Sequence, residues 1–208
     1  MMANEIKAIL FDLGNVLVDV DYNIAAERIA HFCGRSPKEI SELLFSSDIT
    51  RLFEEGKILP GEFFSEVRSM LNLSLSYARF VPIWNEIFFL SAKNRSVYSL
   101  ANNLRNNYKV AILSNINILH YTYLKQYFPV FSIFHNVFAS CEMGLVKPDL
   151  KIYSKTLDTL GVTPEETLYT DDREDLIKCA IGFKIKSFIF TDARKLKSDL
   201  INSGVILN

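Results

Sequence analysis

The stretch "KAILFDLGNVLVDVD", residues 7–21, contains a run of four apolar residues at 8–11 that ends at the acidic residue Asp12. A short, continuous apolar run bounded by polar residues is typical of a strand that is buried on both faces of a sheet. Gly14 and Asn15 then break the chain before a second apolar stretch begins. The stretch therefore predicts a buried strand with a carboxylate at its carboxyl end.

Similar apolar runs that end in polar residues recur along the rest of the chain. They stand at residues 109–115 (KVAILSN), 135–140 (HNVFAS), 167–172 (TLYTDD) and 186–190 (KSFIF). Helix-length segments separate the later runs, which is the pattern of a parallel sheet joined by crossover helices. We therefore predict an α/β fold.

Residues 21–90 have a different pattern, because the strand-like runs disappear and apolar residues recur at spacings of three and four. Phe63, Phe64, Val67 and Met70 are an example of this spacing, which is typical of an amphipathic helix. We predict a helical insert at 21–90 within an α/β core domain made of residues 1–20 and 91–208.

The composition excludes several classes of protein. Apolar residues make up 49% of the 208 residues, and the 23 basic and 24 acidic residues are interspersed. A large core is therefore expected, and no one-signed charge field favours nucleic acid or an anionic membrane as a partner. Without an apolar run of roughly 20 residues or a signal-peptide pattern, the expected location is cytoplasmic. Cys33, Cys141 and Cys179 have the spacing of neither a zinc site nor a disulfide framework, so we expect free thiols.

Polar residues of four kinds follow the predicted strands, where ligands of parallel sheets gather. They are Asp12 after the first strand, Ser114 and Asn115 after the second, Lys147 just past the third, and Asp171 and Asp172 after the fourth. Each is also explained alone by a helix cap or a turn, because short motifs occur often by chance. Their occurrence together, in this order, favours a shared site.

An aspartate, a hydroxyl, a lysine and an acidic pair are the groups that a magnesium-dependent phosphoryl transfer requires. Asp12 and Asp172 would hold the metal, and the second oxygen of Asp12 would attack phosphorus. The Ser114 hydroxyl and the backbone amides at Ser114 and Asn115 would bind the phosphoryl oxygens, while Lys147 would offset negative charge. The set predicts transfer through an aspartyl-phosphate.

With these residues the chain resembles the haloacid dehalogenase superfamily of phosphohydrolases. Its four motifs are similar to "FDLGNVLVD" (11–19), "VAILSN" (110–115), "GLVKPDLKIY" (144–153) and "LYTDDREDL" (168–176). The residues of the first three motifs are most similar to those of bacterial sugar-phosphate phosphatases of the alpha-D-glucose-1-phosphate phosphatase type.

The resemblance implies a Rossmann-like core with the first motif on its central strand, and it implies that the insert at 21–90 is a cap. It also implies that Asp12 is nucleophile and metal ligand, that Asp172 is a metal ligand, and that Asp171 supports the metal or Lys147. The implied cofactor is Mg²⁺.

Two residues depart from the family pattern. Gly14 stands where the family has a second aspartate, so its carbonyl can still bind the metal but the usual proton donor is missing. Either substrates with acidic leaving groups are preferred, such as sugars phosphorylated at the anomeric oxygen, or another residue donates, with His120 the first candidate. Leu176 stands where many relatives have Asn or Asp, so the metal is supported more weakly or by Asp175.

We therefore predict a magnesium-dependent phosphatase that acts on a small phosphorylated metabolite, a sugar phosphate, as a monomer or homodimer. One alternative is a haloacid dehalogenase-type hydrolase that attacks carbon. Gly14 is compatible with that reaction, which needs no general acid, but Asp171 and Asp172 suit a metal that it does not use. The other alternative is a metabolite-binding module whose activity is impaired.

Overall fold

The computed structural model describes residues 5–45 and 47–207. A five-stranded sheet has the order β5-β4-β1-β6-β7, and every pairing in it is parallel. The strands are β1 (Ala8–Phe11), β4 (Lys109–Ser114), β5 (Asn136–Ala139), β6 (Thr167–Asp171) and β7 (Lys186–Ile189). The α/β prediction and its five strands are confirmed, with β1 at the centre.

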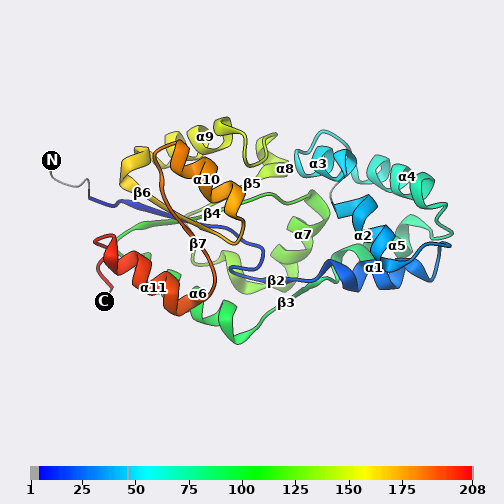
Figure 1. The fold of residues 1–208 in the computed structure, drawn as a ribbon, viewed down its shortest axis with the longest axis horizontal. Helices are drawn as coiled ribbons and strands as arrows, with labels where there is room; N and C mark the ends of the chain where they lie inside the picture. The colour runs from blue at the N-terminus through cyan, green and yellow to red at the C-terminus, as the bar shows by residue number, and fades with distance from the viewer. Residues whose placement is uncertain (1–4, 46, 208) are drawn as a thin grey trace.

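Helices cover both faces of this sheet, which explains why β1 is apolar at every position (Figure 1). Ile9 and Phe11 pack into one hydrophobic cluster with α6 and α11, while Ala8 and Leu10 pack into another with α9 and α10. These helices are α6 (Ala92–Leu104), α9 (Leu150–Leu160), α10 (Glu174–Gly182) and α11 (Ala193–Asn202). We call this part of the molecule the sheet lobe.

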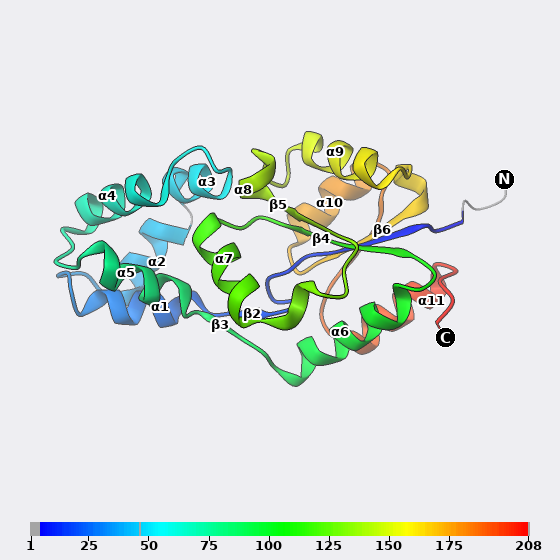
Figure 2. The same cartoon turned by 180° about the vertical axis from the view of Figure 1, so that it is seen from behind.

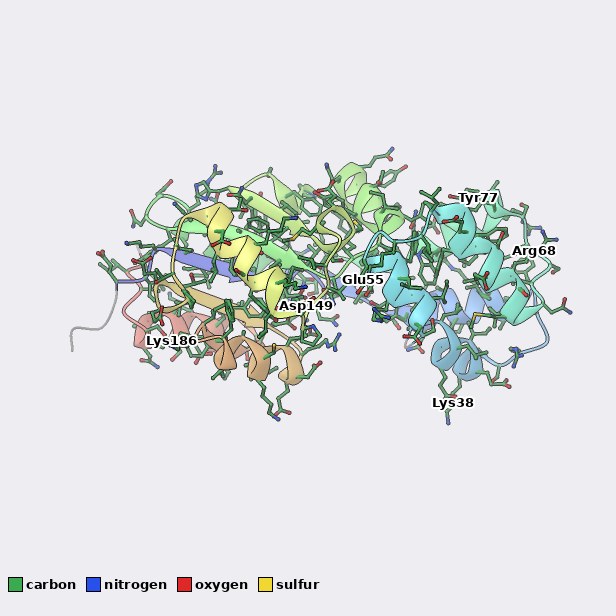
Figure 3. The ribbon with its side chains drawn as sticks, turned by 90° about the horizontal axis from the view of Figure 1, so that it is seen from above. Lys38, Glu55, Arg68, Tyr77, Asp149 and Lys186 are labelled. Atoms are coloured by element: carbon green, nitrogen blue, oxygen red, sulfur yellow. The ribbon has the colours of Figure 1, made fainter. Side chains whose placement is uncertain are left out.

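The segment predicted as a helical insert forms five helices with a hydrophobic cluster of their own. The helices are α1 (Tyr22–Ala30), α2 (Pro37–Phe45), α3 (Asp48–Glu54), α4 (Pro60–Leu71) and α5 (Tyr77–Asn85). Phe53, Phe63, Phe80 and Trp84 lie fully buried at its centre. Figures 1 and 3 show these helices beside the sheet lobe rather than on a face of the sheet, and we call them the helical lobe.

Two connections of only two residues each, β2 (Asp19–Val20) and β3 (Phe88–Phe89), pair antiparallel where the chain enters and leaves the helical lobe. The sequence did not predict them, because two residues are too few to show alternation. The remaining helices are α7 (Ile118–Tyr127), α8 (Ser140–Met143) and two short 3₁₀ helices at Pro129–Phe131 and Pro164–Glu166. From behind, α7 lies between the sheet and α5 (Figure 2).

The three cysteines are half-buried and free, as predicted. Within residues 5–45 and 47–207, the helices are too short or too polar to cross a membrane.

Candidate active site

The seven residues predicted from the sequence to act as nucleophile, phosphoryl ligands or metal ligands, or to support them, all line one cleft near the carboxyl ends of β1, β4 and β6. This cleft has a volume of about 250 Å³. The seven residues are Asp12, Gly14, Ser114, Asn115, Lys147, Asp171 and Asp172. Four more lining residues, Val20, Tyr22, Phe45 and Glu54, come from β2 and the helical lobe, so the cleft lies between the two lobes.

Lys147 lies at the bottom of this cleft, and its side chain is almost fully buried. Its Nζ is 2.7 Å from Oδ1 of Asp12 and 2.7 Å from Oδ2 of Asp171. The same ammonium donates to the Leu113 carbonyl at 3.0 Å and lies 2.9 Å from the Tyr169 hydroxyl. Burial acts to lower the pKa of Lys147, but the two carboxylates outweigh it and raise that pKa. Lys147 is therefore protonated at neutral pH.

The two carboxylates that contact Lys147 are not equivalent. Burial raises the pKa of Asp12 to about 7, and the nearby Asp171 and Asp172 add to this effect, which Lys147 opposes. Burial also acts to raise the pKa of Asp171, but Lys147, the Tyr169 hydroxyl and the Arg173 backbone amide outweigh it and hold that pKa below its usual range. Asp171 is compensated by these donors and orients Lys147, whereas burial and the neighbouring carboxylates disfavour the charged form of Asp12.

Three carboxylates crowd together at the top of β1 and β6. Asp12, Asp171 and Asp172 each offer a carboxylate oxygen, and these oxygens lie within 4.8 Å of one another. Burial, together with the charge of Asp171, also raises the pKa of Asp172. Carboxylate oxygens are the ligands that Mg²⁺ prefers, and a divalent cation would offset the repulsion within the cluster. The donor set therefore fits a magnesium ion.

Asn15, which sequence reasoning used only as a turn residue, holds one of these carboxylates. Its Nδ2 donates to Oδ2 of Asp172 at 2.9 Å, and its Oδ1 accepts from the Val20 backbone amide at 3.3 Å. Asn15 has a φ of 55°, a left-handed conformation that asparagine tolerates better than most residues. In the sequence, an asparagine that directly follows a glycine had indicated this turn.

The backbone conformation and the space around position 14 do not require a glycine. A Cβ at this position would meet only Oδ2 of Asp12 at 3.8 Å and Cγ1 of Val20 at 3.9 Å, which are ordinary van der Waals distances. The absence of the second aspartate therefore has no steric cause, and an aspartate side chain can start from this position.

Asn115 holds Lys147 in place through two hydrogen bonds to its backbone. Its Oδ1 accepts from the Lys147 amide at 2.7 Å, and its Nδ2 donates to the Lys147 carbonyl at 2.9 Å. The Ser114 hydroxyl has only a long contact of 3.4 Å to the Asn115 carbonyl. For an incoming anion the loop therefore offers the Ser114 hydroxyl and backbone amides, while the Asn115 side chain fixes the lysine.

His120 was the first candidate for the missing proton donor, and the structure excludes it. The imidazole is buried outside the cleft, where Nε2 donates to the Trp84 carbonyl at 2.9 Å and Nδ1 accepts from Asn117 Nδ2 at 3.0 Å. Burial lowers the pKa of His120 to about 4, so the ring is neutral. It stacks on Trp84 with ring centroids 5.1 Å apart, and it joins α7 to the helical lobe.

Asp175, suggested as an alternative support of the metal, is not among the residues that line the cleft, and its exposed carboxylate pairs with the Arg173 guanidinium at 2.7 Å. Leu176 lines the cleft as an apolar residue. Sequence reasoning missed Glu54, Tyr22 and Phe45, which reach the cleft from the helical lobe. The spacing of residues within a helix gives no signal that its side chains face a site in another lobe.

The chain matches known proteins over most of its length. The family model of the haloacid dehalogenase-like hydrolases matches residues 6–181 of this chain. The D-ribitol-5-phosphate phosphatase of Bacteroides thetaiotaomicron is 25% identical over 173 residues, covering 80% of this chain and 83% of the relative. A sesquiterpene phosphatase of Aspergillus oryzae is 23% identical over 193 residues, which cover 92% of this chain and 93% of the relative.

Among solved structures, a HAD family enzyme of Bacteroides thetaiotaomicron, in complex with magnesium and inorganic phosphate, is similar with a TM-score of 0.78 and 30% identity. The similarity covers 90% of this chain and 95% of that protein.

Proposed function

This chain belongs to the haloacid dehalogenase-like hydrolases, and from that premise we propose a magnesium-dependent phosphatase that acts on small sugar phosphates through an aspartyl-phosphate on Asp12. Hydrolysis of phosphate esters agrees with the activity for which two of its relatives are named, since both are phosphatases. The observation that carries the proposal is a buried lysine held between Asp12 and Asp171 in the cleft at the strand ends. A lysine desolvated in this way supplies fixed positive charge where phosphoryl transfer develops negative charge.

The proposed reaction assigns a role to each group around the phosphoryl. A free oxygen of Asp12 attacks phosphorus, the alcohol leaves, and water then hydrolyses the aspartyl-phosphate. Lys147 offsets charge on the nucleophile and the phosphoryl, whose oxygens are bound by the Ser114 hydroxyl and by backbone amides at Ser114 and Asn115.

The proposed metal ligands are the carboxylates of Asp12 and Asp172 and the carbonyl of Gly14, with Asn15 orienting Asp172. Mg²⁺ in this position would neutralise phosphoryl charge and template the attack. Asp171 would act on the lysine more than on the metal, because its carboxylate accepts from both Lys147 and Tyr169.

A sugar phosphate is the substrate class that the cleft favours. A second cavity of about 460 Å³ adjoins the first and shares five lining residues with it, Phe45, Glu54, Asn115, Lys147 and Arg173. The polar residues Ser47, Asp48, Thr50 and Arg51 of the helical lobe line this cavity. Such a lining suits the hydroxyl groups of a sugar or polyol better than a hydrocarbon chain.

The helical lobe would then act as the cap domain, at residues 21–90, over a core domain of residues 1–20 and 91–208. The Tyr22 and Phe45 rings lie in a tilted arrangement with centroids 4.3 Å apart, and both residues line the cleft. An aromatic wall of this kind packs against the apolar face of a sugar ring. Specificity would therefore reside in the cap and chemistry in the core.

The test is a screen of phosphorylated metabolites with and without magnesium, scored by release of inorganic phosphate. We expect release from sugar phosphates that requires magnesium and stops in EDTA. A chloroacid substrate, scored by halide release in EDTA, serves as the parallel assay. Halide release without phosphate release would replace the proposal with carbon-attacking dehalogenation, and binding of metabolites without turnover would replace it with a binding module.

A further inference from the structure

The proposed phosphatase lacks an assigned proton donor for the leaving oxygen. Gly14 has no side chain, and His120 is buried away from the cleft with both ring nitrogens hydrogen-bonded. Among the described residues that line the cleft, Glu54 is the one acidic side chain outside the cluster of Asp12, Asp171 and Asp172. It lines both adjoining cavities, so it borders the path between phosphoryl and leaving group.

Glu54 is the last residue of α3, and one buried hydroxyl ties it to the sheet lobe. Ser140 Oγ donates to the Glu54 carbonyl at 2.7 Å and accepts from the Ile116 backbone amide at 2.8 Å. Ile116 follows the Ser114–Asn115 loop, where the phosphoryl oxygens would bind. The position of Glu54 is therefore fixed relative to that loop, although Glu54 belongs to the helical lobe.

The chain directly after Glu54 packs closely against the sheet lobe. Gly56 has a φ of 67°, and a Cβ there would lie 2.3 Å from the Cys141 carbonyl oxygen, so only glycine permits this approach. Figures 1 and 2 both show α3 beside α8. Figure 3 shows the neighbouring Glu55 on the side of the helical lobe that faces the sheet lobe, whereas Arg68 lies at the far end.

The surroundings of Glu54 suit a group that exchanges protons near neutral pH. Burial raises the pKa of Glu54 to about 7, against the lowering effect of Arg173 and Lys147. Tyr22 from α1 and Cys141 from α8 are the other titratable groups that it influences. No hydrogen bond to the Glu54 carboxylate contributes to this pKa among the described residues, and the Arg173 guanidinium pairs with Asp175 instead. The carboxyl group is available to a substrate.

Resting on the proposed phosphatase activity, we propose that Glu54 is a catalytic residue, the acid–base group of the cap that replaces the aspartate missing at Gly14. As Asp12 bonds to phosphorus, the bond from phosphorus to the leaving oxygen breaks, and that oxygen takes the Glu54 proton and departs as an alcohol. The Glu54 carboxylate then takes a proton from the water that attacks the aspartyl-phosphate. This second step frees Asp12, releases phosphate and restores the Glu54 acid.

The experiment compares leaving groups in the full chain with magnesium. Wild type and Glu54→Gln are mixed in single-turnover amounts with p-nitrophenyl phosphate and with three alkyl phosphates, namely glucose 6-phosphate, ribitol 5-phosphate and glycerol 3-phosphate. Nitrophenolate leaves without a proton, whereas an alkoxide needs one, and a well-placed acid contributes about 10²- to 10⁴-fold. Glu66→Gln, on the exposed surface of α4, is the matched control.

We expect Glu54→Gln to slow alcohol release from the alkyl phosphates by about 10²-fold or more, but nitrophenol release by less than about tenfold. With p-nitrophenyl phosphate in excess over the enzyme, Glu54→Gln should release nitrophenol in a burst followed by slow turnover, because the second proton transfer is also lost. Glu66→Gln should match the wild type.

The outcomes separate this proposal from the function on which it rests. Equal slowing of both substrate types, or a KM increase with unchanged single-turnover rates, would overturn the acid–base role of Glu54 in favour of positioning or substrate binding. A wild type that cleaves p-nitrophenyl phosphate but none of the alkyl phosphates would also overturn it. A wild type that releases phosphate from nothing would instead refute the proposed phosphatase.

Discussion

Lys147 and His120 are both buried polar groups, but Lys147 belongs to the proposed reaction site and His120 does not. Lys147 is a charged group whose two carboxylate partners raise its pKa. His120 is a neutral group whose pKa burial lowers to about 4, and each of its ring nitrogens has one hydrogen-bond partner. Burial of a charge is costly unless it is paired; burial and the neighbouring carboxylates outweigh the lowering effect of Lys147 and leave the pKa values of Asp12 and Asp172 raised.

This difference distinguishes a reaction site from a structural contact. The three carboxylates beside Lys147 exceed the charge of that single cation and would be balanced by a metal cation, whereas the histidine contact is complete within the protein. Substitutions in the first region should therefore affect turnover, and substitutions in the second should affect folding. Four substitutions test this division, beginning with the one that should cost most.

Asp12→Asn should give the largest loss. The amide has the same shape but cannot form an aspartyl-phosphate, so we expect phosphate release to fall by about 10⁴-fold or more, with an unchanged circular dichroism spectrum. Initial rates of phosphate release with the best substrate of the screen measure this effect. Activity near that of the wild type would remove Asp12 as the nucleophile.

Lys147→Ala should cost about 2 to 4 kcal/mol of transition-state stabilisation, which is about 30- to 1,000-fold in kcat/KM. The substitution removes the cation that faces Asp12 and the phosphoryl. Lys155→Ala, an exposed lysine on the nearby helix α9, is the control and should retain wild-type kinetics. A loss below tenfold for Lys147→Ala would place this lysine outside the reaction.

Asp172→Ala should weaken magnesium binding by roughly a hundredfold, because it removes a carboxylate ligand and the partner of Asn15. The magnesium concentration that gives half-maximal phosphate release measures the effect, and isothermal calorimetry with magnesium alone gives a second readout. If the wild type and the variant need the same magnesium concentration, Asp172 is not a ligand.

His120 should make the folded state sensitive to acid. Its pKa is about 4 in the folded protein against about 6.5 in an unfolded chain, so the unfolded state binds more protons below about pH 6.5. We expect the free energy of unfolding to fall by about 2 kcal/mol more in the wild type than in His120→Gln between about pH 7 and about pH 5. The measurement is urea denaturation at each pH, with the exposed His31→Gln as control. Parallel pH curves for the wild type and His120→Gln would contradict the buried neutral histidine.

The sequence predicted those site residues whose positions follow directly from the pattern of parallel strands. The apolar run of β1 predicted a strand buried on both faces, and the polar residues at the strand ends were brought into one cleft because parallel strands end at the same edge. Lys147 was found in the same way, although its contacts with Asp171 and Tyr169 depend on tertiary packing.

Contacts between lobes could not be predicted from the sequence. Glu54 lies in a segment that reads as an ordinary amphipathic helix, and its place in the cleft depends on Ser140, a residue 86 positions away. His120 has the sequence context of a helix start, and Trp84 and Phe88 from distant parts of the chain pack on it. Periodicity reports which face of a helix is apolar, but it does not report which lobe that face meets.

The covalent phosphoenzyme proposed on Asp12 can be trapped and identified. Wild type and Glu54→Gln would be mixed with p-nitrophenyl phosphate and magnesium, quenched in acid within one turnover, and measured by intact-mass and peptide mass spectrometry. We expect one added phosphoryl group on the peptide that contains Asp12, with more of it in Glu54→Gln because its hydrolysis is slowed. Nitrophenol release without any phosphoryl group on the protein, or with the group on another residue, would contradict the account.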